Sequence, residues 1–129
     1  MNKELITKLI GRAKEASDNA YCPYTSVPIG CALLTEDNIY TGCNIEYKAL
    51  SHTSAGEVAM HKAISEGQMV FKAVCFYSAD FLPFPSGKTR QLLAEFNPLM
   101  NVVIANDETY NLMTMNDIFP FVPELPEVE

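Results

Sequence analysis

Apolar residues in the first third of the chain recur first at the spacing of a helix and then in strand-like runs. Over residues 3–17 they form one stripe with polar residues on the other side, which predicts an amphipathic helix. Residues 29–35 are typical of a strand, 36–38 of a tight turn and 39–44 of the return strand of a hairpin. The chain is therefore expected to begin with a helix followed by a β-hairpin.

After a polar stretch at residues 46–53, the chain alternates between helical and strand-like segments. The predicted elements are a helix at 55–65 with Gly67 as its C-cap, a strand at 70–78, a helix at 86–96, a strand at 101–105 and a short helix near 115–119. This order predicts an α/β fold, a three-layer α/β/α sandwich. We expect residues 1–129 to form a single domain, with 120–129 as an extended or frayed acidic tail.

The net charge, the first residues and the cysteines indicate which partners, location and redox state to expect. The 129 residues include 9 Lys and Arg against 16 Asp and Glu, a net charge of −7. Because the chain has no excess of positive charge with which to bind phosphate groups, we expect neither nucleic acid nor an anionic membrane as a partner. The first residues lack the apolar run of a secretory signal, so we expect a cytoplasmic protein. Its four cysteines form no Cys-x-x-Cys pair and are expected to be reduced.

Three segments carry more distinctive motifs. Residues 20–46 contain a Tyr-Cys-Pro-Tyr turn, an apolar strand and the sequence Thr-Gly-Cys-Asn-Ile-Glu, while 53–67 and 85–96 each hold a short polar motif and a helix. Together they resemble the small, homotetrameric cytidine deaminases, in which the second and third segments carry Cys-Ala-Glu and Pro-Cys-Gly-x-Cys-Arg-Gln. The resemblance implies a mixed sheet of about five strands between helical layers, and a homotetramer whose subunits complete each other's pockets.

The resemblance also implies zinc chemistry, for which this chain keeps one residue and lacks three. In the family, three cysteine thiolates hold a Zn²⁺ that activates water, and a glutamate moves protons to the cytosine ring. The glutamate corresponds to Glu57, the candidate proton shuttle. The ligand-equivalent positions are Ala55, Ser86 and Thr89, which offer a methyl group and two weakly binding hydroxyls. We therefore expect no metal ligands at these positions and no cofactor.

Two alternatives to this interpretation stay open. His61 follows Glu57 by four residues on the same helix face, so the two could supply two ligands of a rescued zinc site, with a third from elsewhere. The only other histidine is His52, which is expected in a loop. Ser54 and Glu57 also match the S-x-x-E capping box, which would give Glu57 a structural role only.

The two predicted helix starts should meet where zinc would lie in the family. We expect the hydroxyls of Ser54, Ser86 and Thr89 to cap these starts, with Glu57 hydrogen-bonded to the cluster. Lys88 and Arg90 in the second helix start make this a candidate anion site; alternatively, Lys88 reaches solvent or pairs with Glu57.

A nucleoside subsite is implied as well. Asn44 and Glu46 match the family's ribose-binding pair, whose amide and carboxylate suit sugar hydroxyls; alternatively, they are polar residues at the end of a hairpin. Val27 stands where the family has a phenylalanine against the base. Phe121, or alternatively Phe119, is the candidate for a second aromatic residue from the C-terminal region.

These residues leave two hypotheses for the function. The first is a cytidine deaminase family homologue without zinc and without normal deaminase activity, which retains a nucleoside-sized pocket. The alternative is an enzyme: a cytidine deaminase acting on cytidine or deoxycytidine with an unusual metal site, or another nucleoside reaction that depends on Glu57. Because all three ligand positions are changed together, the sequence favours the first hypothesis.

Overall fold

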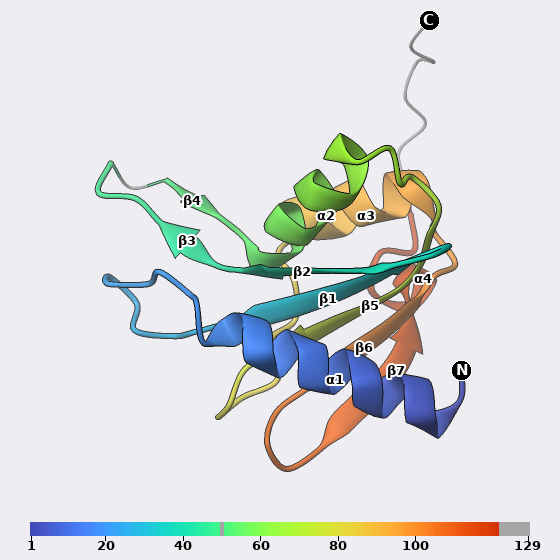
Figure 1. The fold of residues 1–129 in the computed structure, drawn as a ribbon, viewed down its shortest axis with the longest axis horizontal. Helices are drawn as coiled ribbons and strands as arrows, with labels where there is room; N and C mark the ends of the chain where they lie inside the picture. The colour runs from blue at the N-terminus through green and yellow to red at the C-terminus, as the bar shows by residue number, and fades with distance from the viewer. Residues whose placement is uncertain (50, 122–129) are drawn as a thin grey trace, which may run out of the picture.

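A five-stranded sheet in the order β2-β1-β5-β6-β7 forms the centre of the protein in a computed structural model (Figure 1). The structure describes residues 1–49 and 51–121. The strands of the sheet are β1 (Gly30–Thr35), β2 (Ile39–Cys43), β5 (Phe71–Tyr77), β6 (Asn101–Ala105) and β7 (Tyr110–Thr114). Strands β5 and β6 are parallel and the other neighbours are antiparallel, so the sheet is mixed. A small ribbon of β3 (Ile45–Glu46) and β4 (His52–Thr53) extends beyond the end of β2 (Figure 1).

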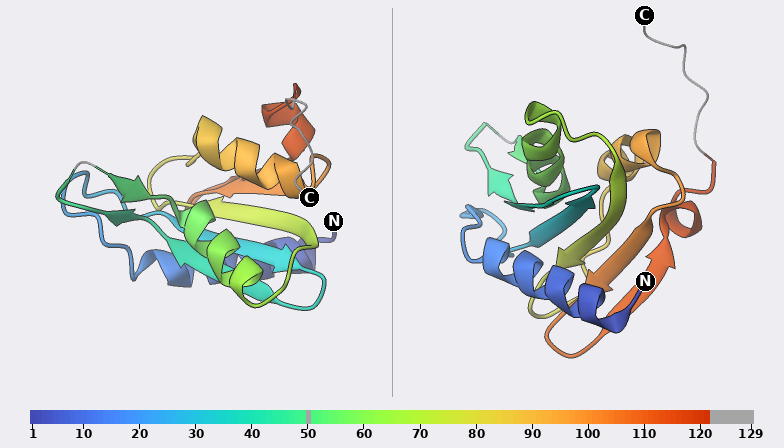
Figure 2. Two further views of the ribbon diagram at one scale, coloured as in Figure 1. Left: turned by 90° about the horizontal axis from the view of Figure 1, so that it is seen from above. Right: turned by 45° about the vertical axis from the view of Figure 1, so that its right-hand side comes forward.

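Helices cover both faces of this sheet (Figure 2). Helix α1 (Lys3–Ser17) lies on one face, and α2 (Ala55–Ser65) and α3 (Gly87–Phe96) lie on the other, with the short α4 (Met115–Ile118) beside α3. Each helical layer encloses its own apolar core, because buried residues alternate between the two faces of the strands. The three-layer α/β/α sandwich with a mixed sheet of five strands is confirmed. Within the described residues, no helix has the length and apolar character needed to cross a membrane.

Gly42 on β2 allows the first turn of α2 to lie directly against the sheet. A Cβ atom at this position would lie 2.4 Å from the carbonyl oxygen of Ala55 and 2.7 Å from the nitrogen of Ala59. Any larger residue would therefore push the start of α2 away from β2. Since Asn44 follows β2 directly, this contact sets the start of α2 beside the polar residues that follow the hairpin.

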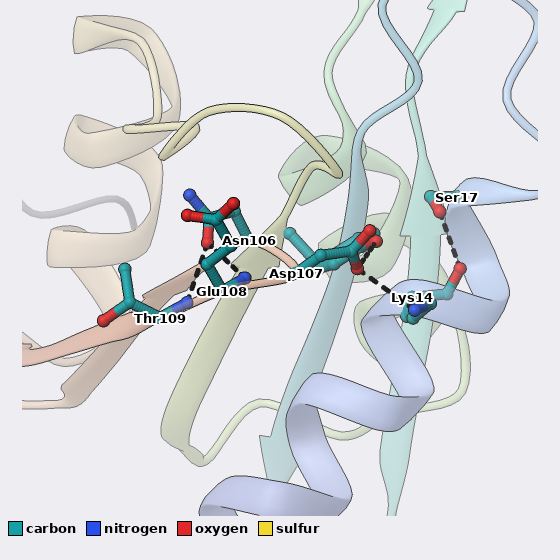
Figure 3. Close-up of polar contacts among 7 residues, drawn as sticks. Lys14, Ser17, Asn106, Asp107, Glu108 and Thr109 are labelled. Carbon is teal, nitrogen blue, oxygen red and sulfur yellow. Dashed lines mark hydrogen bonds and ion pairs between the residues drawn. The ribbon is translucent and has the colours of Figure 1, made fainter.

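The turn between β6 and β7 is fixed to α1 by a small polar network (Figure 3). Lys14 Nζ lies 3.0 Å from Asp107 Oδ1, and the Tyr77 hydroxyl donates to the same oxygen at 2.5 Å. These hydrogen bonds, that of Tyr77 first, lower the pKa of Asp107. Burial and then the bond to Asp107 raise the pKa of Tyr77 to about 12. The network therefore ties the C-terminal part of the sheet to the N-terminal helix.

Most predicted elements are confirmed to within one residue at each end, and the helices at 3–17 and 55–65 and the strand at 101–105 match in full. Gly67 follows α2 with a φ of +80°, and its N–H donates to the Ile64 carbonyl, as expected of a glycine C-cap. Strand β7 and the ribbon of β3 and β4 were not predicted. Strand β7 is largely exposed and lacks a clear alternation, and two-residue strands carry no periodic signal. Of the predicted tail at 120–129, residues 122–129 lie outside the described part of the chain.

Candidate functional site

A cavity of about 400 Å³ opens where the hairpin, the first turn of α2 and the loop before α3 meet. Its walls include the predicted residues Val27, Asn44, Glu46, Ala55, Ser86 and Thr89. Protein cavities that bind small molecules typically start at about 300 Å³, so this one has room for a ligand of nucleoside size. The structure thus brings together residues that lie up to 62 positions apart in the sequence (27 to 89).

Asn44 and Glu46 brace the segment before β1. The Asn44 side chain accepts from the Ile29 N–H at 2.9 Å and donates to the Val27 carbonyl at 2.9 Å. Glu46 accepts from the N–H groups of Tyr24 and Thr25, at 2.9 and 3.1 Å, and from the Thr25 hydroxyl at 2.6 Å. The bond from this hydroxyl is the main reason why the pKa of Glu46 is lowered. Both side chains therefore have structural partners as well as a position on the cavity wall.

Three hydroxyls join the starts of α2 and α3. Ser54 Oγ accepts from the Glu57 N–H at 3.1 Å, and Ser86 Oγ accepts from the Thr89 N–H at 3.3 Å, so each serine caps its helix. Ser54 Oγ lies 2.8 Å from Thr89 Oγ1, and Ser86 Oγ donates to Thr89 Oγ1 at 3.2 Å. The predicted hydroxyl caps are confirmed for Ser54 and Ser86, whereas Thr89 Oγ1 caps no helix and instead bridges the two serines.

Glu57 lies at the inner end of this cluster. Its side chain is 10% exposed, and its carboxylate accepts from Ser54 Oγ at 3.3 Å. The other carboxylate oxygen lies 3.6 Å from Nζ of Lys88, whose side chain is 72% exposed. Lys88 therefore pairs with Glu57, as one of the two alternatives predicts, and Glu57 lies behind Ser54 rather than on the cavity wall.

Phe121 is not brought into the cavity of the single chain. It is 89% exposed, and Phe119 packs against the apolar core instead. Sequence analysis also missed Thr25, Phe76 and Phe84, which line the cavity. The signal for Phe84 was its place between Pro83 and Pro85, directly before a predicted helix start, because such a rigid loop can hold an aromatic side chain at a site. A buried strand residue such as Phe76 gives no comparable signal.

Comparison with known proteins decides the family. Residues 3–106 match the family described as "Cytidine and deoxycytidylate deaminase zinc-binding region". The chain belongs to the cytidine deaminase family. It is 45% identical over 105 residues to a cytidine deaminase of Sporosarcina psychrophila, covering 78% of this chain and 77% of that protein. A probable cytidine deaminase of Dictyostelium discoideum is 34% identical over 124 residues, covering 93% and 84% of the two chains.

The fold is likewise that of the family. The crystal structure of a cytidine deaminase from Burkholderia pseudomallei superposes with a TM-score of 0.86 at 28% identity. The superposition covers 95% of this chain and 99% of that one. The expectation that the protein takes no cofactor is corrected by the family match, because the matched region is a zinc-binding region and spans positions 55, 86 and 89. Zinc is the cofactor that family membership implies.

The residues at the three positions do not fit zinc as the family's thiolates do. Ala55 has no donor atom, and Ser86 and Thr89 offer neutral hydroxyls, which are poor ligands for this metal. The Ser86 hydroxyl already caps α3 and donates to Thr89 Oγ1, which also contacts Ser54 Oγ. The histidine alternative finds no support: His52 and His61 are exposed, and the described residues contain no group of three or more His, Cys, Asp or Glu side chains that could hold a metal.

The four cysteines are free thiols and lie away from the cavity wall. Cys31 and Cys75 are buried, and burial raises the pKa of both thiols, that of Cys75 to about 12. Cys22 and Cys43 are partly buried. That these cysteines are reduced in the cell stays a prediction.

Proposed function

We propose that the protein binds a pyrimidine nucleoside in this cavity and does not carry out the hydrolytic deamination typical of its family. What supports binding is that the cavity is lined by both members of the expected sugar-binding pair and by the hydroxyl cluster. What argues against deamination is the chemistry at positions 55, 86 and 89, where no side chain resembles a thiolate ligand. The ligand class follows from the relatives, which are named cytidine deaminases.

Unused hydrogen-bonding capacity supports a sugar-binding role for Asn44 and Glu46. An amide group has two N–H donors and two lone pairs, of which Asn44 uses one each. A carboxylate has about four lone-pair directions, of which Glu46 uses three. The pair therefore retains one N–H donor on Asn44 and about two acceptor lone pairs, one on each residue. A ribose hydroxyl, which donates and accepts, is the natural partner for such a pair.

Glu57 has a local role that does not depend on turnover. Its carboxylate accepts a hydrogen bond from the Ser54 hydroxyl and forms an ion pair with Lys88, so its negative charge is balanced without a metal-bound water. We propose that Glu57 organises the hydroxyl cluster at the base of the cavity. The alternative, an active deaminase that uses Glu57 as a proton shuttle, is the outcome that a turnover assay would reveal.

The proposed assembly is a homotetramer in the cytoplasm. Tyr24, Tyr47, Phe81 and Phe84 are 45–59% exposed. Aromatic residues are enriched at protein–protein interfaces relative to the rest of the surface. A partner subunit is therefore the proposed cover for these side chains and the proposed source of further contacts for the ligand.

Titration calorimetry tests the binding proposal without altering the fold. We expect cytidine to bind, and 2′,3′-dideoxycytidine to bind about tenfold more weakly, since it lacks the sugar hydroxyls that Asn44 and Glu46 would engage. The variant Glu46→Gln should reduce this difference. Glu108→Gln, a matched change in the exposed turn before β7, should leave it unchanged. Failure of cytidine to bind, or equal binding of the two nucleosides, would contradict the proposal.

A further inference from the structure

A second cavity, of about 510 Å³, lies where the carboxyl end of β5 meets the last turn of α1. Its wall is formed by the end of α1, by the start of the loop after β5, and by one side of the segment 26–28 before β1. Among the described residues, Val27 alone lines both this cavity and the proposed nucleoside site. The proposed function therefore leaves this second cavity without a ligand.

Three buried residues on this wall have hydroxyl groups whose hydrogens are already used. Ser17 donates to a backbone carbonyl of α1 at 2.6 Å (Figure 3), and Ser78 donates to the Pro28 carbonyl at 2.9 Å. The Tyr77 hydroxyl donates to the carboxylate of Asp107. Because a hydroxyl has one hydrogen but two lone pairs, each of these oxygens can still accept a hydrogen bond. To a ligand, the three hydroxyls can therefore act only as acceptors.

The charges on the wall are unbalanced in the same sense. Asp18 and Asp80 line the cavity, and neither forms an ion pair with a residue that the structure describes. Lys14, the basic residue among the described lining residues, is paired with Asp107 at 3.0 Å. Burial, then Asp107, and then the charges of Asp18 and Asp80 raise the pKa of Tyr77 to about 12. Both unpaired carboxylates therefore act on a hydroxyl that lines this cavity.

We propose that this second cavity binds a small organic ammonium ion, which donates N–H bonds to the hydroxyl oxygens and to the carboxylates of Asp18 and Asp80. A ligand of this class supplies both the hydrogens and the positive charge that the wall lacks. Phe81 also lines the cavity and is 45% exposed, so its ring can contact the alkyl part or the cation. The cation is organic rather than a metal, because the described residues contain no group of three or more His, Cys, Asp or Glu side chains that could hold one.

Titration calorimetry of the intact protein with 1,4-diaminobutane, a dication at neutral pH, tests this site. The diamine should bind about tenfold more tightly than 1,4-bis(trimethylammonio)butane, which has the same charge and spacing but no N–H donor. Butane-1,4-diol, which lacks the charge, should not bind measurably. Equal affinities for the two dications, or no binding of the diamine, would overturn the inference. Saturating cytidine should not displace the diamine, and displacement would contradict a separate site. Failure of cytidine itself to bind would overturn only the proposed function.

A pair of double variants separates binding at this cavity from attraction by the protein's overall negative charge. Asp18→Asn with Asp80→Asn should weaken binding of the diamine about tenfold, and both residues are exposed, so the fold should tolerate the change. Glu36→Gln with Asp37→Asn is the matched control. It removes the same charge from the turn at the opposite end of β1 and should leave the affinity unchanged to within about twofold. An equal loss in both double variants would contradict a site at this cavity.

Discussion

Removing the Ser54 hydroxyl should destabilise the protein more than removing an ordinary helix cap. In Ser54→Ala, α2 loses its N-cap, a loss that typically costs about 1 kcal/mol. The same change breaks the bonds from Ser54 Oγ to Thr89 and Glu57, each with a net contribution of roughly 0.5–1.5 kcal/mol. Because Ser54 is only half-buried, water replaces part of this loss. We expect the free energy of unfolding to fall by about 2 kcal/mol.

Urea denaturation followed by circular dichroism measures this change, at a fixed protein concentration because an oligomer's stability depends on it. Asn2→Ala is the matched control: Asn2 caps α1 through one bond to the Leu5 N–H and makes no other described side-chain bond. It should cost only about 1 kcal/mol. If Ser54→Ala costs no more than Asn2→Ala, the hydroxyl cluster does not hold the two helix starts together, and the reasoning on the site fails.

Three further predictions test other parts of the structure. The triple variant Ala55→Cys, Ser86→Cys and Thr89→Cys should bind zinc more tightly than the unaltered chain or the single variant Thr89→Cys. Competition with a chromophoric chelator measures these affinities. Equal affinities would show that the helix starts do not hold three thiolates in the geometry that zinc needs. The pKa of Tyr77 is raised from 10.0 to about 12, first by burial and then by the bond to Asp107. The unfolded chain therefore loses this proton at lower pH than the folded protein, and stability should fall as pH rises from 10 to 12. Tyr77→Phe should show a shallower fall, and identical profiles would contradict the raised pKa of Tyr77. The molar mass measured by light scattering should be four times the chain mass of 14.3 kDa, and the mass of a single chain would contradict the proposed tetramer.

The elements predicted best from the sequence are those in which a periodic apolar pattern is bounded by residues that start or end a helix. The helix at 55–65 has both Ser54 at its start and Gly67 after its end, and its predicted bounds agree with the structure. Strand β7 shows the opposite case. It pairs with β6 across a short turn, but its residues are mostly exposed, so its sequence lacks the pattern that burial imposes.

The site was predictable to the extent that its residues lie in recognisable motifs. Val27, Asn44 and Glu46 lie in one such segment, and the structure brings them to the cavity with Ser86 and Thr89. Their hydrogen bonds were not predictable, because they depend on how the loop before β1 folds back on the hairpin. The exposed position of Phe121 could not be predicted from the sequence either, because it depends on the path of the chain after α4.

The central claim is that this family member binds a nucleoside without deaminating it, and a turnover measurement tests it most directly. The purified protein, supplied with Zn²⁺, is incubated with cytidine and deoxycytidine, and the products are separated by chromatography. The account predicts no uridine or deoxyuridine above the level formed without protein, since no side chain at positions 55, 86 and 89 suits a catalytic metal. Product formation that disappears in Glu57→Gln would contradict the claim and identify the protein as an active deaminase.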